Sequence, residues 1–183
     1  KKKYAAKELL TNKNRIIDFL HELKINSEIN NNLITKLIGY SLHNFDNEPS
    51  MIIITEYIVN GSLERILQNE RNHIKTKFWT GTIKLINIYR IASAILYLHS
   101  QGILHLDIKP SNVLIDEYLL AKICDFSISL KIESDQLINT EIIGTFSFIP
   151  PEIIQHPNSK RTTKSDVYSF GMLLYEMITN HYP

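Results

Sequence analysis

The first third of the chain alternates between strand-like and helix-like spacing of its apolar side chains. Residues 4–10 alternate loosely between apolar and polar positions, which predicts a strand. The segment 13–29 carries apolar side chains at helical spacing and therefore predicts an amphipathic helix. Residues 35–42 and 51–58 are strongly apolar and predict two further strands, joined by a polar loop. We therefore expect this part of the chain to form a small β-rich unit with one helix.

The rest of the chain is dominated by helical periodicity. A helix is expected from about Ser62, and a polar loop is expected over residues 69–82. Apolar positions between 88 and 98 repeat at helical spacing and predict a long helix that ends at Gly102. A last helix is predicted over residues 164–179, where apolar side chains cover much of the circumference. This second part is therefore expected to be mainly helical.

Two short strands and one irregular segment lie between the two long helices. Residues 113–115 and 121–124 predict the strands, on either side of a turn at Asp116 and Glu117. Residues 126–150 show no sustained period, and we expect them to form an extended surface segment. The fold class is therefore expected to be α+β, with a small β-rich lobe followed by a helical lobe.

Composition and charge exclude several classes of protein. A chain of 183 residues can bury a sizeable core as one domain or as part of a larger one. Its 20 Lys and Arg residues nearly balance 19 Asp and Glu residues, so the net charge of +1 does not suggest a nucleic-acid partner. The single cysteine excludes an internal disulfide and fits a reducing compartment. No apolar run could span a bilayer and no signal peptide opens the chain, so we expect a soluble, cytoplasmic protein.

The segment 104–127, LHLDIKPSNVLIDEYLLAKICDFS, concentrates polar groups that suit phosphoryl transfer. Asn112 and Asp125 offer the oxygen ligands preferred by the metal ions that neutralise a triphosphate. Asp107 can orient a hydroxyl nucleophile and accept its proton. Lys109 can follow the charge on the phosphoryl group as it moves. These groups predict Asp107, Lys109 and Asn112 as catalytic residues, and Asn112 and Asp125 as metal ligands.

The order H-x-D-x-K-x-x-N followed by D-F resembles the catalytic loop and metal-binding segment of eukaryotic protein kinases. The resemblance implies a bilobal fold, ATP and Mg²⁺ as cofactors, and protein substrates. It implies that residues 1–57 form an N-lobe that lacks its glycine-rich loop, and that residues 58–183 form a C-lobe that lacks its final helices. We therefore expect 1–183 to be a single partial kinase domain, with additional domains in a longer parent chain.

Two residues of the β-rich part match the phosphate-positioning pair of that family. Lys7, in the sequence AAK, corresponds to the lysine that holds the α- and β-phosphates of the nucleotide. Glu22, on the following helix, would pair with Lys7 and fix its ammonium group. Taken alone, Glu22 is better explained as part of a solvated helix face, but its spacing to Lys7 and the match of the later motifs favour the pairing with Lys7.

Five further residues match positions around the adenine ring in the family. Thr55, Glu56 and Tyr57 resemble the hinge between the lobes, whose backbone groups would bond the adenine edge. Thr55 would be the gatekeeper, and its small side chain implies an open back pocket. Ala5 and Leu114 correspond to the apolar positions that sandwich the adenine, although simple core packing explains them as well.

Two residues of the C-terminal part match positions that support the catalytic loop in the family. Thr145 would bond with Asp107 and Lys109, and Lys109 together with Thr145 is similar to the serine/threonine-directed form of the family. Asp166 resembles the aspartate that holds the catalytic-loop backbone, and it could equally be a carboxylate favoured at a helix N-terminus. The run from residue 97 to 116 looks most like the tyrosine-kinase-like branch.

The chain departs from the family pattern at three positions. Leu106 replaces an arginine that in many members grips a phosphorylated activation segment. Ser127 replaces the glycine of D-F-G, which removes conformational freedom there. Asn26 lies where the family has an apolar residue, so its amide needs a partner. The absent glycine-rich loop and the substitutions at Leu106 and Ser127 motivate the alternative that the chain is a pseudokinase, acting as a nucleotide-binding or scaffold module.

Three other residues near the motifs are expected to pack rather than to act. Cys124 comes directly before Asp125 and is interpreted as a small buried hydrophobe. His99 and His105 show no metal-ligand spacing and are interpreted as packing residues. The leading hypothesis from the sequence is therefore a serine/threonine protein kinase. A small-molecule kinase of related fold is disfavoured by the segment 145–152.

Overall fold

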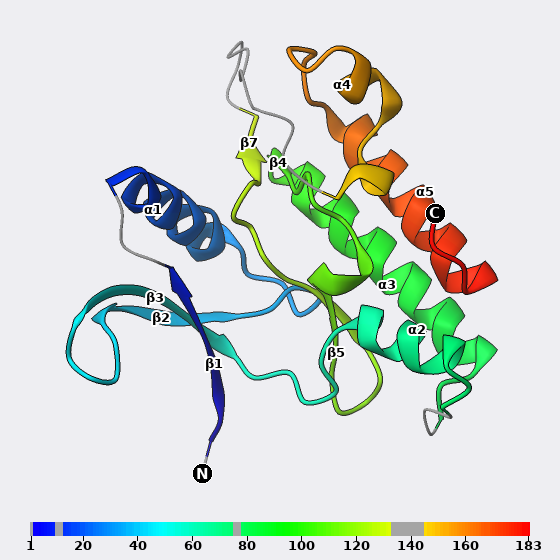
Figure 1. Ribbon diagram of the computed structural model, residues 1–183, viewed down its shortest axis with the longest axis horizontal. Helices are drawn as coiled ribbons and strands as arrows, with labels where there is room; N and C mark the ends of the chain where they lie inside the picture. Colours follow the sequence, from blue (N-terminus) through cyan, green and yellow to red (C-terminus); the bar gives the residue numbers. More distant parts are fainter. Residues whose placement is uncertain (1, 10–12, 75–77, 133–144) are drawn as a thin grey trace.

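The computed structural model describes residues 2–9, 13–74, 78–132 and 145–183 of the chain. Figure 1 shows two parts, a small sheet with one helix and a larger group of helices, joined by the chain that follows β3. The α+β class and the division into a β-rich and a helical part are confirmed.

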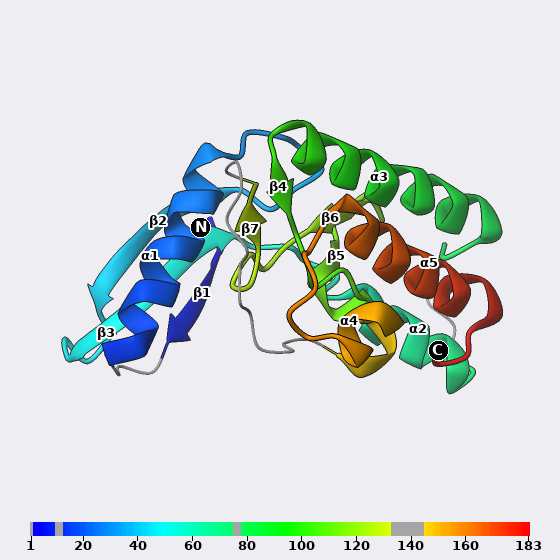
Figure 2. The same cartoon turned by 90° about the horizontal axis from the view of Figure 1, so that it is seen from above.

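The N-terminal part is a three-stranded antiparallel sheet in the order β1-β3-β2, with one helix against it. Phe19 of the helix packs with Met51 and Ile53 of the sheet in a small core, and Figure 2 shows the helix lying along the sheet. The predicted strands and helix are confirmed, with boundaries shifted by at most two residues. The elements are β1 (Tyr4–Leu9), α1 (Lys13–Glu28), β2 (Leu37–His43) and β3 (Pro49–Glu56).

The register of β1 determines which of its side chains face the rest of the molecule. Alternate residues of a strand point to the same side, and Ala5, Lys7 and Leu9 are the half-buried residues of β1. Lys7 lies opposite Ile53 and Ala5 lies opposite Thr55. The strand therefore turns the Lys7 side chain toward α1 and the interior.

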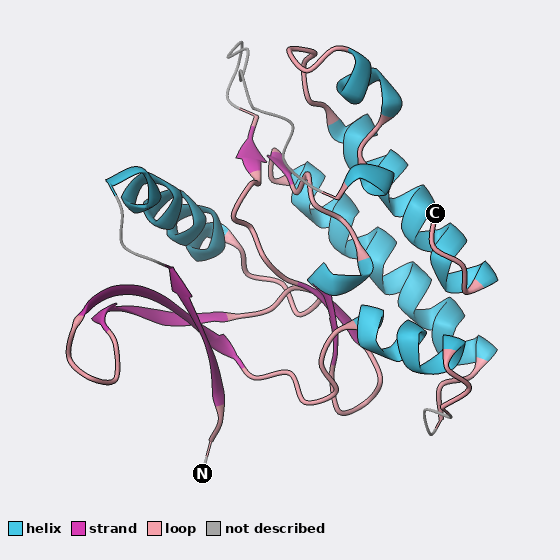
Figure 3. Cartoon of the chain, in the orientation of Figure 1, coloured by secondary structure: helices cyan, strands magenta, loops and turns pink. Residues whose placement is uncertain are grey.

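The C-terminal part is built on helices, and Figure 3 shows α3 and α5 running side by side. Side chains from these helices and from a short hairpin form the larger core, which includes Leu98, Ile115, Phe126 and Leu173. None of the helices in the described ranges is long and apolar enough to cross a membrane. The helices are α2 (Leu63–Arg71), α3 (Gly81–Ser100), α4 (Pro151–Gln155) and α5 (Thr163–Thr179), with 3₁₀ turns at Pro110–Asn112 and Phe146–Phe148.

The prediction of a polar loop over residues 69–82 is wrong at both ends. Helix α2 continues to Arg71, and α3 already begins at Gly81. The hydroxyl of Thr80 accepts a hydrogen bond from the Ile83 N–H, and this N-cap starts α3 ahead of its apolar repeat. Trp79, within the predicted loop, packs against the larger core.

Two short antiparallel pairs connect the helices to the candidate site. Strand β4 (Ile103–Leu104) pairs with β7 (Leu130–Lys131), and β5 (Val113–Ile115) pairs with β6 (Ala121–Ile123). The expected strands at 113–115 and 121–124 are thus confirmed.

The expectation that residues 126–150 form a surface segment is wrong for several described residues. Phe126 and Ser129 have no exposed surface, and Phe148 is also buried. Part of the segment forms β7 and another part forms a 3₁₀ turn. Burial here depends on partners that are distant in sequence, so local periodicity gives no signal of it. Residues 133–144 lie outside the described ranges.

Candidate active site

The predicted catalytic residues lie together in the loop between β4 and β5. The Asn112 Nδ2 donates to Asp107 Oδ2 at 2.6 Å and to the Asp107 backbone oxygen at 2.9 Å. The Lys109 Nζ lies 2.9 Å from the same Asp107 Oδ2. Two side chains therefore bond to one carboxylate oxygen of Asp107, and these bonds fix the direction of its side chain.

Asp166 accepts hydrogen bonds from the backbone of this loop. It has no exposed surface, and it accepts hydrogen bonds from the His105 N–H at 2.9 Å and the Leu106 N–H at 2.7 Å. Its Oδ2 also lies 2.8 Å from His99 Nε2. Asp166 is in the first turn of α5, so the two roles considered for it, loop support and helix N-terminus, hold together. His99 is a hydrogen-bonding partner of Asp166 rather than a simple packing residue.

His105 is fully buried behind the loop. Its Nδ1 accepts a hydrogen bond from the Asp107 N–H at 3.2 Å, and its Nε2 lies 3.1 Å from the Cys124 carbonyl oxygen. The ring also stacks at a tilt against Phe126, with centroids 5.1 Å apart. Burial lowers the pKa of His105 despite the nearby carboxylates, so the neutral ring with its proton on Nε2 fits both hydrogen bonds.

Lys7 joins two carboxylates from different parts of the chain. Its Nζ lies 3.0 Å from both Glu22 carboxylate oxygens and 2.7 Å from Asp125 Oδ1. Burial works to lower the pKa of Lys7, but the hydrogen bond to Asp125 and the charges of both carboxylates raise it. The ammonium group is therefore firmly protonated. Glu22 is 3% exposed, which excludes the solvated helix face considered for it.

The pKa values of Glu22 and Asp125, the two carboxylates that bond Lys7, are shifted in opposite directions. Burial raises the pKa of Glu22 above its ordinary value, although Lys7 acts against this shift. Burial acts in the same sense on Asp125, but hydrogen bonds from Lys7 and Ser127 bring its pKa below the ordinary range. Asp125 is therefore the better ionised of the two and the better metal ligand.

The predicted metal ligands lie on adjacent backbone segments. The Cys124 N–H donates to the Asn112 carbonyl oxygen at 3.0 Å, which brings Asp125 next to the catalytic loop. The amide nitrogen of Asn112 is occupied by Asp107, so its Oδ1 is the atom left to bind a cation. Two protein oxygens fit Mg²⁺, which is usually held by one or two protein ligands together with phosphates and water.

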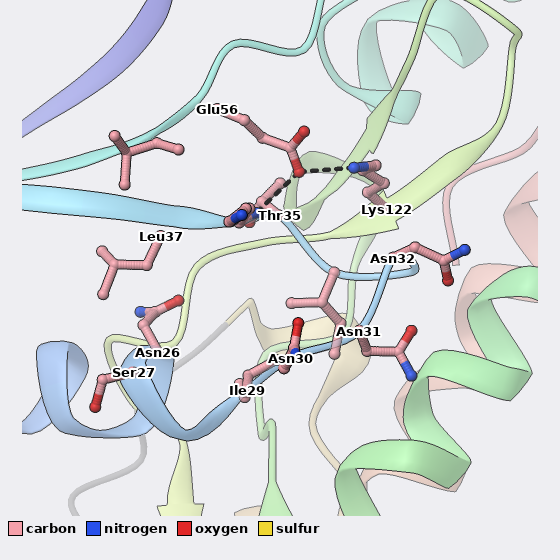
Figure 4. Close-up of a pocket in the computed structure, with 13 residues that line it drawn as sticks. Asn26, Ser27, Ile29, Asn30, Asn31, Asn32, Thr35, Leu37, Glu56 and Lys122 are labelled. Carbon is pink, nitrogen blue, oxygen red and sulfur yellow. Dashed lines mark hydrogen bonds and ion pairs between the residues drawn. The ribbon is translucent and has the colours of Figure 1, made fainter.

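Glu56, predicted as a hinge residue, bonds through its side chain to Lys122 and to the Lys36 backbone. Its Oε1 lies 2.6 Å from Lys122 Nζ and accepts a hydrogen bond from the Lys36 N–H at 2.9 Å. These groups line a cavity of about 670 Å³ between α1, β2 and β6, shown in Figure 4. The Glu56 N–H donates to the Lys36 carbonyl oxygen, so this N–H is already paired within the protein.

The other predicted adenine-contacting residues lie on three separate elements. Ala5 and Thr55 are partners in the β1–β3 register, and Leu114 of β5 bridges to Ser62. Ala5, Thr55 and Leu114 are half-buried, whereas Tyr57 is exposed. Their exposure is compatible with contact to a nucleotide, and adenine binding by these residues stays a prediction.

The chain matches the family described as "Protein kinase domain" over residues 1–183. The chain belongs to the protein kinase family. It is similar to Wall-associated receptor kinase-like 18 of Arabidopsis thaliana, with 36% identity over 181 residues, which are 97% of the chain and 22% of the relative. It is 35% identical over 180 residues to Cysteine-rich receptor-like protein kinase 2 of the same plant, covering 96% of the chain and 26% of the relative. The chain thus spans about a quarter of the length of these relatives.

Several residues that support this kinase domain were not identified from the sequence. The His21 Nε2 lies 2.6 Å from the Ser129 carbonyl oxygen, and the Ser129 hydroxyl donates to the His105 carbonyl oxygen at 3.0 Å. A histidine beside Glu22 was the only available signal, and it does not indicate its partner.

Two expectations for polar groups in the kinase domain are resolved by their contacts. The buried Asn26 donates from Nδ2 to the Glu22 carbonyl oxygen at 2.9 Å, so it has the partner that its burial requires. Thr145 accepts a hydrogen bond from Lys109 Nζ at 3.2 Å. Among the described residues, Thr145 makes no hydrogen bond with Asp107, so only half of that expectation is met.

Proposed function

We propose that this chain is the catalytic part of a serine/threonine protein kinase, which transfers the γ-phosphoryl group of ATP to hydroxyl groups of protein substrates. The observation that carries the proposal is the network on Asp107, where Lys109 and Asn112 meet one carboxylate at 2.9 and 2.6 Å. A second network supports the proposal, in which Lys7 forms ion pairs with Glu22 and Asp125.

The proposed chemistry assigns one task to each group of the first network. Asp107 orients the substrate hydroxyl and accepts its proton as the oxygen bonds to the γ-phosphorus. Lys109 neutralises part of the charge on the transferring phosphoryl group. Asn112 contributes its Oδ1 to Mg²⁺ and holds Asp107 with its amide nitrogen. The bond from the γ-phosphorus to the bridging oxygen breaks, and ADP leaves.

The second network would position the nucleotide. Lys7 binds the α- and β-phosphates, and Glu22 keeps the ammonium group in place. Asp125 would be the second protein ligand of Mg²⁺, which would neutralise phosphate charge when bound. The adenine would lie between Ala5 and Leu114, with its edge at Thr55, Glu56 and Tyr57.

Other features support the proposed substrate class, cellular compartment and domain content of the whole protein. The Lys109–Thr145 hydrogen bond of 3.2 Å supports a serine/threonine-directed site rather than a tyrosine-directed one. A single cysteine and a net charge of +1 support a cytoplasmic protein that acts on proteins and not on nucleic acid. The greater length of the receptor-kinase relatives supports further domains in the whole protein.

Phosphate transfer by the full-length protein tests this proposal. We expect label from γ-³²P-ATP to reach serine and threonine of a generic substrate such as myelin basic protein, only when Mg²⁺ is present. Nucleotide binding without transfer would contradict the proposal and favour the pseudokinase. Label found on tyrosine alone would contradict the serine/threonine assignment.

A further inference from the structure

A hydrogen bond of His21 joins α1 to the segment that follows Asp125. His21 Nε2 lies 2.6 Å from the Ser129 carbonyl oxygen, so the ring donates its proton to the backbone. His21 directly precedes Glu22, the residue that bonds Lys7. The bond to the Ser129 carbonyl oxygen therefore fixes His21 and, through the adjoining backbone, limits where the Glu22 carboxylate can lie.

A second contact between the same two segments lies two turns further along α1. Glu28, at the end of the helix, forms an ion pair with Lys131 of β7. His21 and Glu28 are seven residues apart, which places them on the same side of the helix. The hydrogen bond from Lys131, together with its charge, lowers the pKa of Glu28. Helix α1 is thus attached to residues 129–131 at two points.

The opposite side of residues 129–131 is attached to the strand that leads into the catalytic loop. The Ser129 hydroxyl, which has no exposed surface, donates to the His105 carbonyl oxygen at 3.0 Å. Leu130 and Lys131 pair with β4, and the Ile132 N–H donates to the Gly102 carbonyl oxygen at 2.6 Å. The segment 129–132 therefore connects α1 to the backbone just before Asp107.

We propose that His21 and Glu28 are positioning residues, which hold α1 against residues 129–131 and so keep Glu22 bonded to Lys7 without a phosphorylated side chain. Leu106 has no charged group that could bind a phosphate, and the loop around it is held by Asp166 instead. This inference rests on the proposed kinase function for its kinetic consequences.

A charge exchange at the ion pair tests one of the two contacts. The variants are Glu28→Lys, Lys131→Glu and the double variant, all in the full-length protein after phosphatase treatment. We expect each single variant to lower kcat/KM for ATP about two- to fivefold, the range for a partly exposed pair. The double variant should regain activity to within about twofold of the unmodified protein. Single variants without effect, or a double variant as impaired as the singles, would overturn the role of Glu28.

A conservative replacement tests the other contact. His21→Gln keeps an N–H donor, whereas His21→Leu removes it, and His43→Leu on the exposed part of β2 is the matched control. We expect His21→Leu to lower kcat/KM about three- to tenfold, with His21→Gln and His43→Leu close to the unmodified protein. Equal losses in His21→Gln and His21→Leu would show that packing, and not the hydrogen bond, matters there.

Amide hydrogen exchange separates this inference from the proposed function. We expect faster exchange of the α1 amides in Glu28→Lys, Lys131→Glu and His21→Leu, with normal exchange restored in the charge-exchanged double variant. This pattern in a protein that transfers no phosphate would support the positioning role and contradict the kinase function. Unchanged α1 exchange in an active kinase would contradict the positioning role alone.

Discussion

The Leu106 N–H donates a hydrogen bond of 2.7 Å to Asp166, whose side chain has no exposed surface. Leu106 has a φ of 64°, a left-handed conformation that is unfavourable for a leucine by about 1–2 kcal/mol. The hydrogen bond compensates for this strain and turns the backbone so that Asp107 faces Asn112. Asp166, on a helix 60 residues away, is thus what makes the loop conformation possible.

Asp166→Ala should therefore destabilise the protein. It would leave the N–H groups of His105 and Leu106 without their acceptor, which costs about 2–5 kcal/mol in the free energy of unfolding. Urea denaturation of the variant and of an exposed control, Asp46→Ala, measures this cost. A loss in Asp166→Ala no larger than in the control would contradict the account of the loop. Replacing Leu106 by Gly in the Asp166→Ala background should recover part of the stability, because glycine tolerates the left-handed conformation.

A buried ion pair gives a second prediction on stability. Arg71 Nη1 lies 3.0 Å from Glu176 Oε1, and Glu176 is 2% exposed. Burial raises the pKa of Glu176 while Arg71 acts against that shift, so the carboxylate depends on its partner. Arg71→Met should lower the free energy of unfolding by about 3–5 kcal/mol, because it leaves a buried charge without compensation.

The matched test of this pair is the double replacement of Arg71 by Met and Glu176 by Leu. It removes both charges and should be clearly more stable than Arg71→Met alone. Thermal unfolding of the three proteins compares them directly. A double variant that is less stable than the single variant would show that Arg71 acts through something other than Glu176, such as its position 3.9 Å from the ring of Tyr182.

The buried His105 predicts how stability depends on pH. Burial lowers its pKa in the folded state, whereas an unfolded histidine titrates near about 6.5. Below that pH the unfolded chain binds more protons at this position than the folded protein does. Stability should therefore fall as the pH drops below about 6.5, with a slope of up to about 1.4 kcal/mol per pH unit from this group.

The contribution of His105 can be isolated with His105→Gln, which has no titrating ring. The stability of this variant should fall less steeply between about pH 6.5 and 5 than that of the unmodified protein, as measured by urea denaturation at several pH values. Identical slopes for the two proteins would contradict a neutral, buried His105.

Much of the fold and of the site was predictable from the sequence because the relevant signals are local. Asp107, Lys109 and Asn112 lie within six residues of one another, so a single tight loop is enough to bring them together. The elements of the sheet and the long helices have apolar repeats of the right period, which fixed their type and most of their bounds.

The contacts that the sequence did not predict are those between distant segments. His21 and Ser129 are 108 residues apart, and no local pattern pairs a histidine ring with a backbone carbonyl oxygen. The burial of Phe126 likewise depends on the larger core. The start of α3 was missed for a different reason, since Thr80 is an N-cap within a stretch that is otherwise polar and irregular.

The single cysteine gives a prediction on reactivity. Burial raises the pKa of Cys124 to about 12, so its thiolate fraction at neutral pH is far below that of an ordinary thiol. Labelling by iodoacetamide at pH 7.5 should be at least about tenfold slower in the folded protein than in urea, as followed by intact mass. Equal labelling rates would contradict the raised pKa of this half-buried thiol.

Asp107 is the proposed acceptor of the proton of the substrate hydroxyl. Asp107→Asn keeps the shape of the side chain and removes the base, so the direct test is kcat for phosphate transfer at saturating Mg²⁺-ATP, together with the Kd for the nucleotide. We predict that kcat falls about 10²- to 10⁴-fold while the Kd changes little, because Lys7 and Asp125 remain in place. An unchanged kcat in Asp107→Asn would contradict the claim.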